Sequence, residues 1–209
     1  MPPTRAIAPR TGAAVTVLKI GGSLTASDAA LRLMRGLAER RPPGLLIVPG
    51  GGAFADRVRA TQAQHGLGEQ AAHHMALLAM HMVAVLLADL APGFALAEGP
   101  GQFQSAWTQG LMPIWLPAPM VMSAADIPAS WDVTSDSLAA WIAERTGATR
   151  LVLVKSCTVP AQRDDARVLA AAGVVDACFP RFVERRRFSW EVISGWEPAL
   201  SLVSAGERV

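Results

Sequence analysis

A unit of strand, glycine turn and helix occurs twice within the first 65 residues. In the first copy, residues 15–20 (VTVLKI) form a β-branched apolar run that ends in the glycine pair 21–22. Residues 25–28 (TASD) then match a capping box for a helix that reaches about Arg41. Residues 45–64 repeat the unit with the strand LLIV, the turn PGGG and a second helix. Strands that alternate with helices in this way predict an α/β fold with a mainly parallel sheet covered on both faces.

The rest of the chain continues the alternation less regularly. We expect residues 117–131 to form a long surface excursion near the ligand, and Thr134 to cap the helix that follows. We expect one domain over residues 14–209, preceded by a flexible tail over 1–13. The further elements that we predict are helices at 69–90, 102–110, 134–145 and 168–172, and strands or extended segments at 94–97, 113–116, 150–154, 174–175 and 190–193.

Composition argues against nucleic acid, membrane and disulfide roles. The formal net charge is +2 and the only dense basic group is the arginine run 185–187, so no broad basic face for duplex binding is expected. The most hydrophobic segment, residues 75–97, is interrupted by His81, Asp89 and a Pro-Gly pair. These interruptions favour a buried helix followed by a buried strand over a membrane span. Cysteines 157 and 178 lack metal-ligand spacing, and we expect both to be buried fillers in a cytoplasmic protein.

Lysine occurs at two positions only, whereas the chain has seventeen arginines. Lys19 and Lys155 both lie at the predicted carboxyl ends of strands, where open parallel sheets bind their ligands. The glycine turns at 21–22 and 50–52 follow strands at the same edge, and glycine lets backbone N–H groups approach an anion closely. A compact ammonium group suits a small site around a phosphoryl group better than a broad guanidinium does. We therefore predict that the two lysines grip a phosphoryl group in transit.

Asp132 and Asp136 stand at the start of a predicted helix, four residues apart. Asp136 is the better functional candidate, because two lysines that converge on a phosphate need a carboxylate to hold their ammonium groups. For Asp132, helix capping and function are equally supported. Lys19 precedes the glycine pair 21–22, whereas the lysine of the motif G-x-x-x-x-G-K-[ST] follows its glycines, so the chain is not a P-loop NTPase.

All four histidines lie in or just before the long predicted helix, at positions 65, 73, 74 and 81. No H-E-x-x-H motif or carboxylate at ligand spacing accompanies them, so no metal site is predicted. Contact with a substrate and hydrogen bonding within a packed helix remain equally supported for each histidine. The sequence leaves the roles of His65, His74 and His81 open.

Four segments resemble the amino acid kinase family, which includes acetylglutamate, uridylate, aspartate and isopentenyl phosphate kinases. The resemblance implies a three-layer α/β/α sandwich and the use of ATP with Mg²⁺, the metal being held mostly by the nucleotide's own oxygens rather than by a protein cage. The matching segments are VLKIGGSL at 17–24, VPGGGAFAD at 48–56, VTSDSLAA at 133–140 and the strand that ends at Lys155.

The resemblance also implies roles for single residues. The catalytic group would be Lys19, Lys155 and Asp136. The residues that bind ATP or its phosphates would be Gly21, Gly22, Ser23 and Ser135. The residues that bind the acceptor would be Gly50, Gly51, Gly52, Asp56 and His73, with Asp56 as the partner of an acceptor amine.

Within the family, the chain is most similar to kinases of the methanofuran pathway. The segments AHHMALLAM at 72–80 and GVVDACFP at 173–180 carry this narrower resemblance. It implies transfer of the γ-phosphoryl group of ATP to [5-(aminomethyl)furan-3-yl]methyl phosphate. Other acceptors, such as isopentenyl phosphate, a nucleoside monophosphate or an amino acid, remain open, and so does a non-catalytic oxyanion store resembling molybdenum storage proteins. We expect a homo-oligomer with exposed Met and Trp between 107 and 131 at its interface.

Overall fold

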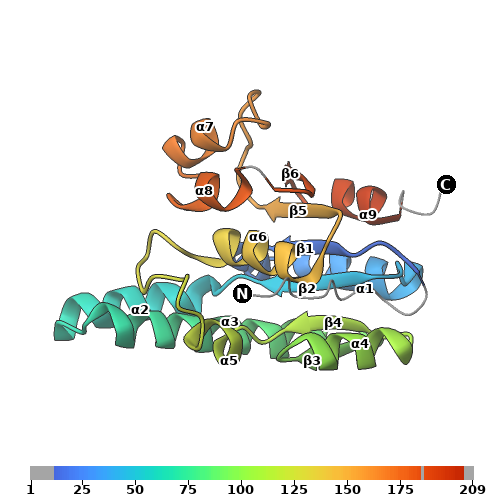
Figure 1. Cartoon of the computed structure of the whole chain (residues 1–209), viewed down its shortest axis with the longest axis horizontal. Helices are drawn as coiled ribbons and strands as arrows, with labels where there is room; N and C mark the ends of the chain where they lie inside the picture. Colours follow the sequence, from blue (N-terminus) through green and yellow to red (C-terminus); the bar gives the residue numbers. More distant parts are fainter. Residues whose placement is uncertain (1–11, 185, 205–209) are drawn as a thin grey trace.

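The computed structural model describes residues 12–184 and 186–204, and these form one twisted sheet with helices on both faces (Figure 1). All strand pairings are parallel, in the order β3-β4-β2-β1-β5-β6. The predicted three-layer α/β/α fold is confirmed. The strands are β1 (Thr16–Ile20), β2 (Leu45–Pro49), β3 (Phe94–Ala97), β4 (Met112–Trp115), β5 (Arg150–Lys155) and β6 (Ser189–Ser194).

Two apolar clusters line the two faces of the sheet. One lies between the sheet and the helices α4, α6 and α8, and the other between the sheet and α1, α3 and α9. In Figure 1, α6 lies in front of the central strands and α1 behind them. The helices are α1 (Ala29–Arg40), α2 (Gly52–His65), α3 (Glu69–Asp89), α4 (Pro100–Thr108), α5 (Ala118–Met122), α6 (Ser135–Thr146), α7 (Ala166–Ala171), α8 (Phe179–Val183) and α9 (Glu197–Ser204).

The central strands are buried on both faces, so side-chain alternation decides which helix each residue meets. In β1, Val17 belongs to the cluster under α6, and Leu18 and Ile20 belong to the cluster under α1. Lys19 is two residues from Val17 and therefore faces α6. The same rule applied to β5 puts Lys155 in phase with Leu153, which is also in the cluster under α6.

The long helix α3 is long enough and apolar enough to span a membrane. Among the described residues it is the only helix of that length and composition. In this fold it packs against α2, α5 and strands β2, β3 and β4. The interpretation of this segment as a helix followed by a strand is confirmed, since Asp89 ends α3 and Phe94 begins β3.

Several local predictions are wrong. The capping box at 25–28 is not formed, because a 3-10 helix (Gly22–Ala26) precedes α1 and the side chain of the N-cap residue Asp28 makes no capping hydrogen bond. Residues 174–175 form a bend rather than a strand, and the excursion at 117–131 contains α5. Between 107 and 131 the tryptophans at 107 and 115 are buried, and Cys157 is exposed rather than buried.

The predicted tail over residues 1–13 lies almost wholly outside the described residues. The first member of the arginine run 185–187 also lies outside the described residues. The single-domain boundary therefore stays a prediction.

Candidate active site

Two lysines and one aspartate form a buried charge cluster at the carboxyl edge of the sheet. The Lys19 Nζ lies 2.8 Å from Asp136 Oδ1, and the Lys155 Nζ donates a hydrogen bond of 2.6 Å to Asp136 Oδ2. Each side chain is at most 11% exposed. The Lys19 contact is an ion pair without hydrogen-bond geometry, so Oδ1 remains short of a donor. The lysines come from adjacent strands, β1 and β5, and Asp136 from the first turn of α6.

The charges of the cluster shift the ionisation of its members. Burial and the Lys19 charge lower the pKa of Lys155 to about 8, although Asp136 opposes this shift. Burial by itself would raise the pKa of Asp136, but the two ammonium groups outweigh it and hold that pKa below its usual value. The cluster carries one surplus positive charge when both lysines are protonated, which is the condition for attracting an anion.

A second carboxylate, Asp176, holds the helix that carries Asp136. Its Oδ2 accepts from the Thr134 N–H, the Thr134 hydroxyl and the Ser137 N–H at 2.9, 2.9 and 3.0 Å, and its Oδ1 accepts from the Ser137 hydroxyl. Thr134 is therefore at the N-cap position but does not cap α6 with its own side chain. Asp176 serves as a cap from 42 residues away and satisfies N–H groups that a helix leaves without partners.

Sequence reasoning assigned no role to Asp176. The residue lies in GVVDACFP, a segment that we used only for its resemblance to relatives. A lone carboxylate between apolar residues was the available signal. Its target on α6 is too distant in sequence to have been identified from spacing.

The two glycine turns meet each other in space. A Cβ placed on Gly22 would lie 2.1 Å from the Gly52 nitrogen, and one on Gly50 would lie 2.5 Å from the Gly22 nitrogen. Gly52 also has a φ of +53°, which favours glycine. Side chains at these positions would force the turns apart, so glycine is required for close packing of the two backbones. Backbone N–H groups in such a junction are suited to bind phosphate oxygens.

The structure places the other predicted ATP-side residues around the same edge. Gly21 follows β1 directly and donates its N–H to the Val154 carbonyl at 2.9 Å. The Ser23 and Ser156 hydroxyls are 2.7 Å apart and join the first glycine turn to the segment after β5. Ser135, at the start of α6, is nearly buried and lines a pocket beside the cluster.

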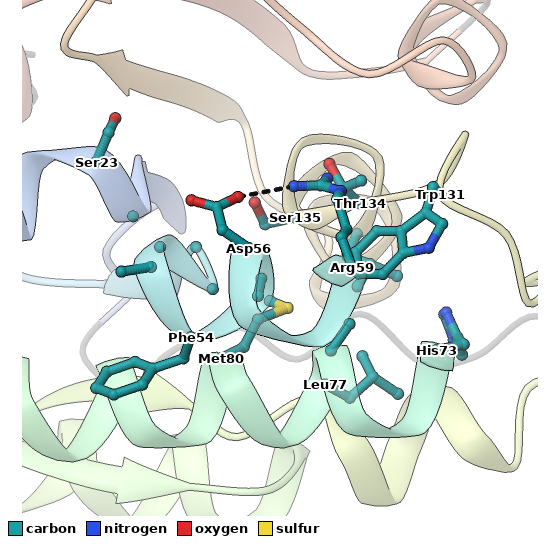
Figure 2. A pocket seen from close by; sticks show the side chains of 18 of the residues that line it. Ser23, Phe54, Asp56, Arg59, His73, Leu77, Met80, Trp131, Thr134 and Ser135 are labelled. Atoms are coloured by element: carbon teal, nitrogen blue, oxygen red, sulfur yellow. Dashed lines mark hydrogen bonds and ion pairs between the residues drawn. The ribbon is translucent and has the colours of Figure 1, made fainter. Parts of the chain in front are cut away.

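That pocket has a volume of about 580 Å³ and lies between α2, α3 and the start of α6 (Figure 2). It contains all the predicted acceptor residues, namely Gly50, Gly51, Gly52, Asp56 and His73, together with Gly22, Ser23 and Ser135. Its apolar floor is formed by Leu77, Met80, Val133 and Leu138. The lining that the sequence did not identify includes Arg59, Glu69, Trp131 and Thr134.

One acidic and one basic residue of the pocket, Asp56 and Arg59, form an ion pair with each other. The Arg59 Nη1 donates to Asp56 Oδ1 at 3.0 Å, and both side chains are largely exposed to solvent. Asp132, in contrast, is exposed and does not join the cluster, although its carbonyl accepts from the Cys178 N–H. Of the two aspartates weighed at the start of α6, only Asp136 meets the lysines.

The histidines do not gather into one site. His73 lines the pocket, and burial and the neighbouring His74 lower its pKa. His81 Nε2 accepts from the Ala118 N–H at 3.0 Å and so ties α3 to α5. His65 and His74 are exposed. Among residues 12–184 and 186–204, no three His, Cys, Asp or Glu side chains are grouped to hold a metal ion.

Comparison with known proteins identifies the family. Residues 14–158 match the family model for the amino acid kinase family. Over 128 residues the chain is 28% identical to [5-(aminomethyl)furan-3-yl]methyl phosphate kinase of Methanocaldococcus jannaschii. That match covers 60% of this chain and 58% of the relative, which is less than two thirds of the relative's length.

Two solved structures share the fold. Uridylate kinase from Archaeoglobus fulgidus superposes with a TM-score of 0.69 at 15% identity, over 90% of this chain and 95% of that one. UMP kinase from Ureaplasma parvum gives 0.64 at 14% identity, over 87% and 90%. The family match extends over most of the chain, including the glycine turns and the Lys19–Asp136–Lys155 cluster. The chain belongs to the amino acid kinase family.

Proposed function

We propose that this protein is an ATP-dependent kinase that transfers the γ-phosphoryl group to a small acceptor carrying a phosphate. The observation that carries the proposal is the pair of buried ammonium groups held on one carboxylate beside two interlocked glycine turns. Catalysis of phosphoryl transfer rests mainly on positioning and on neutralising charge, and this cluster supplies both.

In the proposed reaction an oxygen of the acceptor phosphate forms a bond to the γ-phosphorus as the bond from that phosphorus to the β–γ bridging oxygen breaks. ADP leaves with the electron pair of the broken bond. Lys19 and Lys155 would neutralise the phosphoryl oxygens and the leaving oxygen, and Asp136 would keep both ammonium groups in place. N–H groups of Gly22 and Gly52 would hold the phosphates. No general base is needed, because a phosphate oxygen is already deprotonated near neutral pH.

Mg²⁺ fits this site only as a partner of the nucleotide. The described residues offer one buried carboxylate, already shared by two lysines, and no group of ligands that could cage an ion. Mg²⁺ characteristically keeps waters and binds substrate phosphates with few protein ligands. When bound, it would neutralise charge on the phosphate oxygens of ATP.

For the acceptor we propose [5-(aminomethyl)furan-3-yl]methyl phosphate. The supporting observation is the relative of that name, which is 28% identical to this chain over 128 residues. The pocket has an apolar floor for a ring, glycine turns for a phosphate, and the Asp56 carboxylate for an ammonium group. Only Asp56 Oδ1 is engaged by Arg59, so the second oxygen can accept from the amine. The scattered histidines give no support to an oxyanion store.

The proposal is tested by offering ATP with a panel of phosphate-bearing acceptors and following ADP release. The product diphosphate is identified by phosphorus NMR. We expect the aminomethylfuran phosphate to be turned over with the highest kcat/KM, and the matching alcohol without a phosphate to be inactive. ATP hydrolysis that no acceptor stimulates would refute the proposal. In Asp56→Asn, an unchanged KM for the amine-bearing acceptor would rule out the assigned role of Asp56.

A further inference from the structure

Arg59 and Trp131 form one wall of the acceptor pocket (Figure 2). Arg59 projects from α2, and its guanidinium carbon lies 4.2 Å from the centroid of the indole ring of Trp131. A hydrogen bond holds the indole in place, since its Nε1 donates to Gln62 Oε1 at 2.6 Å. Gln62 in turn donates to Glu69 Oε1 at 3.0 Å and to the Leu67 carbonyl at 3.2 Å. The aromatic platform under Arg59 is therefore tied to the junction of α2 and α3.

The guanidinium of Arg59 points back toward the glycine turns. Side chains on a helix lean toward its N-terminus, and Arg59 reaches Asp56, one turn closer to Gly52. Gly52 and Ser135 line the same pocket as this group. The acceptor phosphate must lie in this region if it is to attack a phosphoryl group held beside Lys19.

Arg59 is the only lysine or arginine among the residues that line the pocket. Lys19 and Lys155 are bound to Asp136 and serve the group in transit under the proposed function. A phosphate dianion in the pocket would therefore lack a cation of its own unless Arg59 supplies it. His73 cannot substitute, since its lowered pKa keeps it neutral at physiological pH.

The contacts of Arg59 leave it free to bind an anion. The guanidinium lies over the indole ring, and the one hydrogen bond shown from its N–H groups is that from Nη1 to Asp56. The pair with Asp56 is solvent-exposed on both sides, and such pairs are weak. A planar guanidinium also matches two oxygens of a phosphate at once.

We infer that Arg59, which lies over the indole ring of Trp131, is a specificity-determining residue that binds the phosphate group of the acceptor. This inference rests on the proposed function and deepens it, because it explains how an acceptor with a phosphate is preferred over the matching alcohol. If Arg59 only stabilised α2 by stacking, its removal would change the melting temperature and leave the KM for the acceptor unaltered.

The test compares Arg59→Gln with Arg57→Gln. Arg57 lies on the same helix and is also exposed, but it does not line the pocket. In Arg59→Gln we expect the KM for the phosphate acceptor to rise roughly 10- to 100-fold, as for loss of a charge-assisted hydrogen bond. The KM for ATP and the melting temperature should stay at their wild-type values. Arg57→Gln should leave all three quantities unchanged, and equal effects of the two substitutions would overturn the inference.

Asp56→Asn gives a second, opposite readout. The substitution releases Arg59 from its ion pair, so benzyl phosphate, which has a ring and a phosphate but no amine, should bind more tightly than to wild type. The same variant should bind the aminomethylfuran phosphate more weakly, because the amine loses its partner. Weaker binding of benzyl phosphate to Asp56→Asn would contradict the inference.

Equilibrium binding separates this inference from the proposed function. If wild type turns over no phosphate acceptor, the proposed function fails, and calorimetric titration with benzyl phosphate still decides on Arg59. We expect wild type and Arg57→Gln to bind it and Arg59→Gln to lose most of that affinity. Absence of binding by wild type, or equal binding by Arg59→Gln, would overturn the role of Arg59.

Discussion

At the scale of single residues, the distinctive feature is that two like charges share one buried carboxylate. Lys19 and Lys155 both contact Asp136, and little solvent reaches any of the three. A buried cluster of this kind is costly unless each member keeps its partner, so the geometry is sensitive to changes at any of the three positions. The lowered pKa of Lys155 is the direct consequence that can be measured.

The pH dependence of catalysis should report on Lys155. Its pKa is about 8, and the protonated form is the one that neutralises phosphate. The protonated fraction falls as pH rises through about 8, so kcat/KM for ATP should fall by about tenfold per pH unit above that value. ATP and the acceptor phosphate are already deprotonated in this range and do not contribute.

Lys155→Arg is the control for this titration. Arginine stays protonated throughout the range, so the decline above pH 8 should disappear. Its broad guanidinium should also fit the site poorly and give lower activity at pH 7. Full activity in Lys155→Arg would show that compact charge is not what the position requires.

At the scale of elements, the site is assembled from strand ends, glycine turns and one capped helix. Strand alternation directs both lysines to α6, and Asp176 fixes the first turn of α6 through four hydrogen bonds. The glycine junction then brings the turns after β1 and β2 into contact. A single substitution can disrupt the helix cap or the glycine junction separately.

Asp176→Asn removes the charge and one acceptor oxygen from the cap of α6. We expect the free energy of unfolding to fall by about 1–2 kcal/mol, as for loss of a helix cap. The turnover should fall as well, because Asp136 lies in the turn that the cap orders. Asp132→Asn is the matched control, since its exposed side chain takes no part in this cap. If Asp176→Asn unfolds at a lower denaturant concentration but keeps the wild-type kcat, the cap does not contribute to catalysis. That result would refute the expected fall in turnover.

Gly22→Ala should disrupt the junction of the two glycine turns. The added methyl group would lie 2.1 Å from the Gly52 nitrogen, so the two backbones must separate. We expect a loss of about 1–3 kcal/mol in unfolding free energy, as for overpacking, and loss of ATP binding by calorimetry. Gly101→Ala in α4, where a Cβ has open space, should keep both properties. Wild-type ATP affinity in Gly22→Ala would show that close approach of the turns is not required.

The sequence was sufficient to predict the order of the main strands and helices and the residues of the charge cluster. The rarity of lysine and its position at the carboxyl ends of predicted strands are local signals, and both identify Lys19 and Lys155. The cap on α6 and the Arg59–Trp131 wall were not predicted, because they join residues 42 and 72 positions apart through tertiary packing alone. The capping box at 25–28 was predicted wrongly, since a 3-10 helix runs from Gly22 to Ala26 into that segment.

At the scale of the whole molecule, three exposed apolar side chains gather on α3, whereas Met122 is the one large apolar residue between 107 and 131 that is exposed among the described residues. Leu78, Met82 and Val85 are 46%, 50% and 54% exposed and recur at helical spacing on one face. A contiguous apolar stripe of this kind is typical of an interaction surface. The expected homo-oligomer therefore has a more suitable interface on α3 than the one expected from sequence.

Met82→Glu tests that interface. A charge at the centre of the stripe should dissociate an oligomer built on α3, and light scattering should then report a lower mass than for wild type. Arg57→Gln on the exposed side of α2 serves as the control and should keep the wild-type mass. A monomeric wild type would refute the expectation, as would an oligomer that Met82→Glu leaves intact.

The charge cluster predicts how far kcat should fall when either lysine is removed. With saturating ATP and acceptor, Lys19→Ala and Lys155→Ala should each lower kcat for ADP release on the order of 10²- to 10³-fold, as for loss of one donor to a transition-state oxygen. Circular dichroism should show that both variants remain folded. Wild-type kcat in both folded variants would contradict a phosphoryl-transfer site built on Lys19, Asp136 and Lys155.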